Sequence, residues 1–88
     1  MTIHVERSHI MGSEPRSTTM CPIARALQEQ IPGQGTWCVW LNKAALWPGK
    51  SYDLPTTAVD FIKDLLDGKS VKPFLFTLEE SHYAYDHR

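Results

Sequence analysis

The chain has 88 residues, which is the size of one small domain. Hydrophobic residues make up 42% of it and charged residues 22%, a composition that excludes collagen-like and wholly disordered chains. Nine Lys and Arg residues are balanced by ten Asp and Glu residues, giving a formal charge of −1. A general nucleic-acid binder carries a basic excess, so nucleic acid is disfavoured as a partner.

The chain contains no apolar run near the roughly 18 residues that a membrane span requires. Its first residues, Met1–Arg7, lack the pattern of a signal peptide, so we expect a cytoplasmic protein without a membrane partner. Cys21 and Cys38 are then expected to be free thiols. The histidines and cysteines lack zinc-type spacing, and we expect no metal or other cofactor. Because so small a domain buries little surface, a homodimer would be one way to bury more.

The first half of the chain predicts two strands and a helix. Residues 2–6 alternate as a short strand does, and residues 7–19 are typical of a long loop. Pro22 suits the first position of a helix, which Pro32-Gly33 would end. Residues 36–42 are apolar on both faces and predict a strand that is covered on both sides.

The second half predicts further strands and a second helix. Residues 44–47 and 51–53 suggest short strands, and a helix follows Pro55. Thr57 and Asp60 would form a capping box, and Gly68 would end this helix. Its expected apolar stripe consists of Val59, Ile62, Leu65 and Leu66, with Ala58 and Phe61 on its flank.

Residues 71–79 predict the last strand, with Phe74, Phe76 and Leu78 on one face. Pro73 cannot donate to a β-ladder, so this strand belongs at a sheet edge or begins at Pro73. We expect one domain over residues 1–79 and a flexible tail over residues 80–88.

The resulting order is strand, helix, strand, strand, helix, strand. It predicts an α+β fold, ferredoxin-like or a variant of it, with two helices on one face of an antiparallel or mixed sheet. An alternative arrangement with an extra hairpin around residues 47–53 remains open.

A candidate ligand site precedes the first helix. Arg16, Ser17, Thr18 and Thr19 lead into the helix N-terminus, and Arg25 lies one turn inside it. Free N–H groups, hydroxyls and a guanidinium would together suit an anion such as a phosphate. Helix capping by the same hydroxyls is the more ordinary explanation. Cys21 at this helix start could be an activated nucleophile, although a capping or packed thiol is more common.

A second set of residues suggests an interaction surface. The aromatic residues exceed what one face of a small core requires, and aromatic side chains are enriched at binding hot spots. Asp60, Asp64 and Asp67 would form one acidic stripe on the second helix, suited to a basic partner or simply solvated. The candidate interaction residues are Trp40, Trp47, Lys50, Tyr52, Asp60, Asp64 and Asp67.

Several segments together resemble small uncharacterised proteins encoded by bacteriophages. They are Cys21–Leu27 (CPIARAL), Leu54-Pro55 with Phe61-Ile62, Asp67-Gly68-Lys69, and Val71–Leu78 (VKPFLFTL). The resemblance covers most of residues 2–78 and implies no catalytic role. It implies an accessory protein, made inside an infected bacterium, that blocks a host component.

We therefore expect a non-enzymatic protein that binds and inhibits a host component, in the manner of an anti-defence or anti-CRISPR-type inhibitor. One alternative is a small-molecule binder that sequesters an anionic ligand such as a nucleotide signal. A second alternative is a cysteine-dependent enzyme using Cys21.

Overall fold

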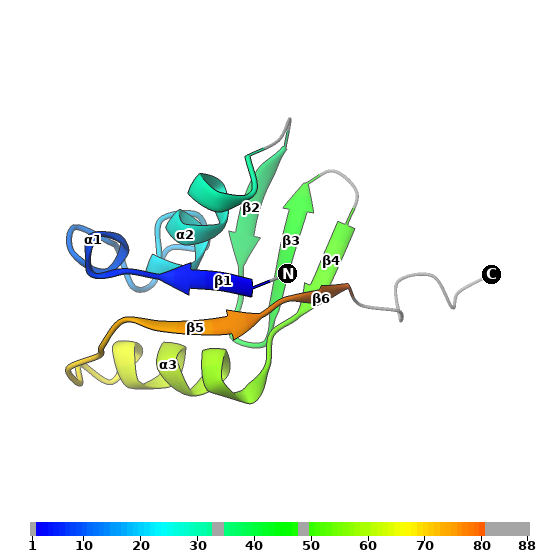
Figure 1. Ribbon diagram of the computed structural model, residues 1–88. Helices are drawn as coiled ribbons and strands as arrows, with labels where there is room; N and C mark the ends of the chain where they lie inside the picture. Colours follow the sequence, from blue (N-terminus) through cyan, green and yellow to red (C-terminus); the bar gives the residue numbers. More distant parts are fainter. Residues whose placement is uncertain (1, 33–34, 48–49, 81–88) are drawn as a thin grey trace.

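The computed structural model describes residues 2–32, 35–47 and 50–80 (Figure 1). Within these ranges the elements follow in the order β1 (Thr2–Val5), α1 (Arg7–Ile10), α2 (Pro22–Gln30), β2 (Thr36–Val39), β3 (Lys43–Trp47), β4 (Lys50–Asp53), α3 (Thr56–Leu66), β5 (Phe74–Thr77) and β6 (Glu79–Glu80). The α+β class predicted from the sequence is confirmed. The expected tail lies, apart from Glu80, outside the described residues.

The strands form two antiparallel sheets rather than the single sheet that the sequence suggested. β1 pairs with β5, and β2, β3, β4 and β6 form a four-stranded sheet in that order. The β3–β4 hairpin corresponds to the alternative arrangement around residues 47–53. The chain passes from one sheet to the other at Leu78, which lies between β5 and β6 and is buried. Burial of Leu78 therefore links the two sheets through one core.

Helix α2 packs between the sheets, where it contacts both β1 and β2. Its buried face includes Ala24 and Ala26, whose small side chains let the helix approach the strands closely. One cluster of buried side chains spans both sheets and both long helices. It comprises Ile3, Val5, Cys21, Ile23, Ala24, Ala26, Leu27, Trp37, Val39, Ala44, Tyr52, Leu54, Ala58, Phe61, Ile62, Phe76 and Leu78.

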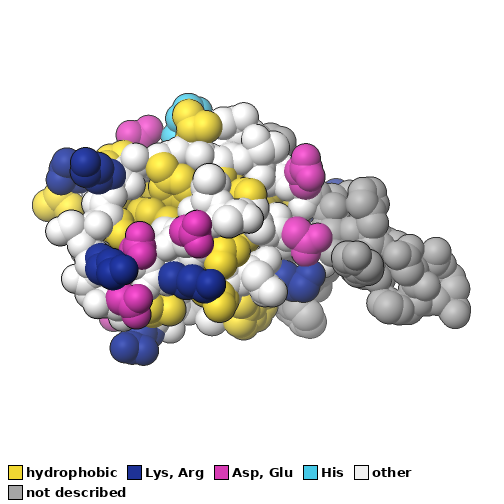
Figure 2. Space-filling view, turned by 90° about the horizontal axis from the view of Figure 1, so that it is seen from below, with side chains coloured by type: hydrophobic (Ala, Val, Ile, Leu, Met, Phe, Trp, Pro, Cys, Tyr) yellow, Lys and Arg dark blue, Asp and Glu magenta, His cyan; other side chains and the backbone are white. Residues whose placement is uncertain are grey.

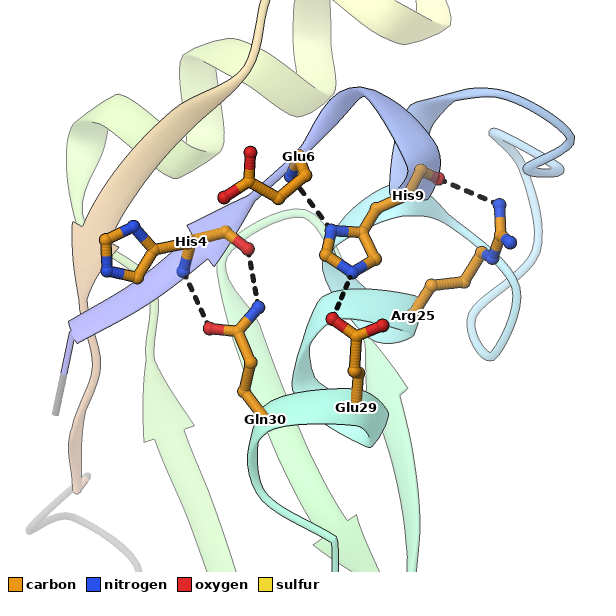
Figure 3. A network of polar contacts seen from close by, with 6 residues as sticks. All are labelled: His4, Glu6, His9, Arg25, Glu29 and Gln30. Carbon is orange, nitrogen blue, oxygen red and sulfur yellow. Dashed lines mark hydrogen bonds and ion pairs between the residues drawn. The ribbon is translucent and has the colours of Figure 1, made fainter.

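The segment predicted as a loop over residues 7–19 contains the one-turn helix α1. The cause is a buried histidine: His9 Nδ1 accepts a hydrogen bond from the Glu6 N–H (2.8 Å), and His9 Nε2 contacts Glu29 Oε1 at 2.9 Å (Figure 3). Because Nδ1 accepts, the ring hydrogen of neutral His9 lies on Nε2 and points to Glu29. A single histidine thus caps α1 and fastens it to α2.

Two expectations about β2 and α3 are wrong. Only one face of β2 is covered, since Trp37 and Val39 are buried while Thr36 is exposed. The N-cap of α3 is Pro55, and no side chain caps that helix, so the expected capping box is absent.

The buried face of α3 is also shifted from the expected stripe. Ala58 and Phe61, expected on the flank, are buried together with Ile62. Val59 and Leu65 are partly buried against the core, and Leu66 is exposed. Gly68 has φ +79°, a left-handed conformation that suits glycine, and it follows the end of α3 as predicted.

A candidate binding cavity beneath the loop before α2

A cavity of about 150 Å³ lies between the loop before α2, the start of α2, the end of β2 and one side of α3. Most of its lining is apolar. The lining residues are Pro15, Arg16, Ser17, Thr18, Cys21, Pro22, Ile23, Val39, Trp40, Phe61, Ile62, Leu65 and Leu66. Arg16 is the one charged residue among them. A more open hollow of about 500 Å³ adjoins it and shares Pro15, Arg16, Ser17, Leu65 and Leu66.

Backbone and hydroxyl hydrogen bonds hold the loop over this cavity. The Val39 N–H donates to the Thr18 carbonyl at 2.7 Å, so the loop covers part of the edge of β2. Ser17 Oγ accepts from the N–H groups of Thr19 (3.2 Å) and Met20 (3.0 Å). These local bonds fold the chain back on itself as a hydroxyl-capped turn. The loop is therefore a fixed wall of the cavity.

The structure brings together four of the six residues proposed for ligand binding. Arg16, Ser17, Thr18 and Cys21 all line the cavity. Thr19 does not line it, and its carbonyl accepts a hydrogen bond from Gln28 Nε2 at 3.0 Å. The spacing along the chain predicted that all six candidate residues lie near the start of α2. In the structure, the turn at Ser17 instead points the Thr19 carbonyl toward Gln28 of α2.

Arg25 also lies outside the cavity lining. Its Nη1 donates to the His9 carbonyl at 3.0 Å (Figure 3). The same atom donates to the Met11 carbonyl at 2.7 Å, also at the end of α1. These two bonds satisfy carbonyls that a helix end leaves without partners. Arg25 therefore joins α1 to α2, and Arg16 is the cation that the cavity presents.

Cys21 is a buried N-cap residue. Its Sγ accepts a hydrogen bond from the Ala24 N–H at 3.5 Å. Burial raises the pKa of the Cys21 thiol above its ordinary value, and this effect outweighs the opposing hydrogen bonds from the backbone of α2. A nucleophilic cysteine needs a lowered pKa, so the geometry favours a structural role for this thiol.

The candidate interaction residues do not form one surface. Tyr52 is a core residue, 7% exposed, and its ring packs against Trp37 with centroids 5.5 Å apart. Its assignment to an exposed surface is wrong, because β4 turns its side chain inward. Trp40, by contrast, is 51% exposed at the cavity rim. Lys50 is exposed at the start of β4, and the Trp47 side chain lies outside the described part of the chain.

The acidic residues of α3 and its C-cap remain at the surface. Asp60 and Asp67 are exposed, and Asp64 is half-buried and lies 3.7 Å from Lys69 Nζ. None of the three lines the cavity; Asp60 and Asp64 line another hollow, between α3 and β5.

The sequence did not identify the α3 side of the cavity. Phe61, Ile62, Leu65 and Leu66 form this wall. Leu65 and Leu66 were assigned to the core stripe, whereas Leu66 is partly exposed at the rim. A pair of leucines at the end of an amphipathic helix does not by itself predict a cavity wall. These two become a wall only because the loop before α2 lies opposite them.

Over residues 2–32, 35–47 and 50–80, no cluster of three or more histidine, cysteine or acidic residues is arranged to hold a metal ion. None of the helices described there combines the length and apolar character required to cross a bilayer. No protein-family model matches the chain, and no curated protein or solved structure is detectably similar to it.

Proposed function

We propose that this protein is a non-enzymatic binding protein that inhibits a partner protein by taking one of the partner's apolar side chains into the cavity beneath the loop. In line with the bacteriophage resemblance, the partner would be a host component in the bacterial cytoplasm, including components of host defence. The observation that carries the proposal is an apolar cavity with a half-exposed tryptophan at its rim.

The size of the cavity favours a side chain over a nucleotide. Drug-sized and nucleotide-sized ligands occupy roughly 300–1,000 Å³, whereas this cavity is about 150 Å³. An apolar cavity of about 150 Å³ is large enough for a benzene-sized group. A leucine, methionine or phenylalanine side chain therefore matches the volume and the lining.

Trp40 and Arg16 would supply the rim of such an interface. Tryptophan and arginine are the residue types most often found at binding hot spots. Arg16 is exposed and makes no hydrogen bond or ion pair within the described part of the chain. Its guanidinium is thus available to a carboxylate on the partner, next to the side chain that enters the cavity.

A second candidate function is the binding of a small anionic ligand. Arg16 lines both the cavity and the adjoining open hollow, whose combined space could hold an apolar group attached to a carboxylate or phosphate. The two functions differ in their response to small molecules. A ligand binder shows a melting temperature that rises with the concentration of a nucleotide or another anion, and a protein binder does not.

The test is photo-crosslinking in bacterial cells with a benzophenone amino acid in place of Met20, an exposed residue of the loop that does not itself line the cavity. We expect one stoichiometric partner, and we expect Trp40→Asp and Arg16→Glu to abolish the crosslink without lowering the melting temperature.

Leu41→Asp and Lys50→Glu are matched controls, because both residues are exposed and neither lines the cavity. If the controls weaken the crosslink as strongly as the cavity variants, or if no partner is captured, the proposed function is wrong.

A further inference from the structure

The hydrogen bonds of His4 reveal which way the backbone of β5 faces. The His4 N–H donates to Gln30 Oε1 at 2.9 Å, and Gln30 Nε2 donates to the His4 carbonyl, on the side of β1 away from β5 (Figure 3). Residue pairs in an antiparallel ladder alternate between hydrogen-bonded and non-hydrogen-bonded. His4 pairs with Leu75 in the ladder. Because the His4 N–H and C=O face Gln30, this is a non-hydrogen-bonded pair. The N–H and C=O of Leu75 therefore also point away from β1.

The same alternation applies two residues further on. Thr2 pairs with Thr77, so the backbone groups of Thr77 also point to the outer edge of β5. Pro73 occupies the preceding outward position, where its missing N–H costs no bond to β1. Within the described part of the chain, no backbone hydrogen bond joins Leu75 or Thr77 to a loop or helix. The outward N–H and C=O groups of Leu75 and Thr77 therefore have no backbone hydrogen-bond partner among the described residues, whereas those of His4 are paired with Gln30.

A hollow of about 430 Å³ runs beside this outer edge, between α3 and the chain entering β5. Phe61 and Phe74, whose rings stack with centroids 4.5 Å apart, and Val71 form its apolar part. Figure 2 looks onto the α3 side of the molecule and shows hydrophobic surface bordered by charged side chains. Leu75 adds an exposed apolar side chain, 57% accessible.

The charged groups around this hollow are nearly balanced, and Asp60 is the carboxylate without an ion pair among the described residues. The lining contains the carboxylates of Asp60 and Asp64 and the single ammonium group of Lys72. Asp64 is partly neutralised by Lys69. A lysine or arginine on an incoming segment would therefore find an acceptor at Asp60.

We propose that the outer edge of β5 is a docking site for an extended segment of a partner protein, which joins the β1–β5 sheet as a third strand. Unpaired backbone groups at Leu75 and Thr77 are complementary to another β-strand, and strand addition to a free sheet edge is a general mode of peptide recognition. The segment carries an apolar residue toward Phe61 and Phe74 and a basic residue toward Asp60. This surface is separate from the Trp40 rim and does not depend on the function proposed for the cavity.

Amide hydrogen exchange of the free protein tests whether this edge is unpaired. We expect fast exchange at Leu75 and Thr77 and slow exchange at Phe74 and Phe76, whose N–H groups face β1. Slow exchange at Leu75 and Thr77 in the monomer would show that the edge is already covered and would overturn the proposal. Protection that grows with protein concentration, together with a dimer in sedimentation, would assign the edge to a second copy and also overturn it.

Binding is tested with a blocked peptide in which valine and lysine stand two residues apart, separated by threonine, at up to millimolar concentration; as a strand it presents valine and lysine on the same face. We expect it to slow exchange at Leu75 and Thr77, and we expect the same peptide with glutamate in place of lysine to bind several-fold more weakly. If the lysine peptide leaves both amides unchanged, or if the two peptides bind equally, the proposal is wrong.

Backbone variants separate strand addition from other contacts. Leu75→Pro removes an N–H that faces away from β1, so it should abolish peptide binding, while Leu75→Ala keeps the N–H and most of the binding. Thr77→Pro provides a second variant of the same kind if Leu75→Pro fails to fold. Asp60→Lys should weaken binding of the lysine peptide, whereas Asp67→Lys, outside the hollow, should not. Unchanged binding by a folded proline variant would rule out strand addition.

Discussion

The side-chain amide of Gln30 pairs with both backbone polar groups of His4, accepting from the N–H at 2.9 Å and donating to the carbonyl at 2.6 Å. A single glutamine from α2 thereby imitates a neighbouring strand along β1. Exposed sheet edges invite pairing with other chains, and proteins commonly block them. Here the block also fixes the distance between α2 and the β1–β5 sheet.

We predict that Gln30→Ala lowers the free energy of unfolding by about 1 kcal/mol, the usual net value of an exposed hydrogen-bonded pair. The variant should also self-associate more readily, because the edge of β1 is uncovered. Urea unfolding and analytical sedimentation measure the two effects. Gln28→Ala, which removes one bond to Thr19, should lose stability without associating. An equally monomeric Gln30→Ala would contradict the account of the blocked edge.

The second prediction concerns His9, which is 4% exposed and engages both ring nitrogens. His9→Phe keeps a ring of similar shape but leaves the Glu6 N–H without its acceptor. We expect a loss of about 0.5–1.5 kcal/mol of stability, the usual net value of a hydrogen bond, because the bond to Glu6 is only partly buried, together with fraying of α1 in NMR spectra. Glu29→Gln keeps an oxygen acceptor for Nε2 and should cost less. Equal losses for the two variants would count against the capping role of Nδ1.

Thiol labelling under native conditions gives the third prediction. Cys21 is buried and Cys38 is partly exposed, and both are free. We expect a maleimide to label Cys38 first and to reach Cys21 only when the protein opens. Mass spectrometry of the Cys38→Ser variant measures the rate at which Cys21 is labelled. Rapid labelling of Cys21 in that variant at neutral pH would contradict a structural thiol.

Alkaline pH should destabilise the fold partly through Cys21. Burial raises the pKa of this thiol in the folded state, so the folded chain holds the proton more tightly than the unfolded chain does. This contribution is fully present below the unfolded pKa of about 8.5 and is lost as pH rises above it. Cys21→Ala should therefore show a shallower loss of stability above that pH than the parent chain. Parallel curves would contradict the raised pKa.

The sequence predicted those features of the fold that depend on neighbouring residues. Pro22 does begin α2 and Gly68 does follow α3. Phe76 and Leu78, predicted to share one face of the last strand, are both buried. Each of these depends on backbone preferences or on side-chain alternation, which neighbouring residues determine.

Features that depend on distant partners could not be predicted in this way. His9 fastens α1 to α2 through Glu29, twenty residues away, and Arg25 binds the carbonyls at the end of α1. The spacing of residues along the chain does not predict contacts between residues that are distant in the sequence. For the same reason the sequence predicted the loop side of the cavity through Arg16 and Ser17, but it did not predict the wall from α3.

The most direct test of the central claim is the thermodynamics of partner binding to a variant with a filled cavity. Leu66→Trp places a larger side chain at the rim of the cavity without replacing a fully buried residue. With the partner captured by crosslinking, calorimetry should show at least tenfold weaker binding, about 1.4 kcal/mol, for this variant and for Trp40→Ala. Leu41→Ala is the control and should bind the partner as tightly as the parent chain. If Leu66→Trp and Trp40→Ala also bind as tightly as the parent chain, a binding function at this cavity is contradicted.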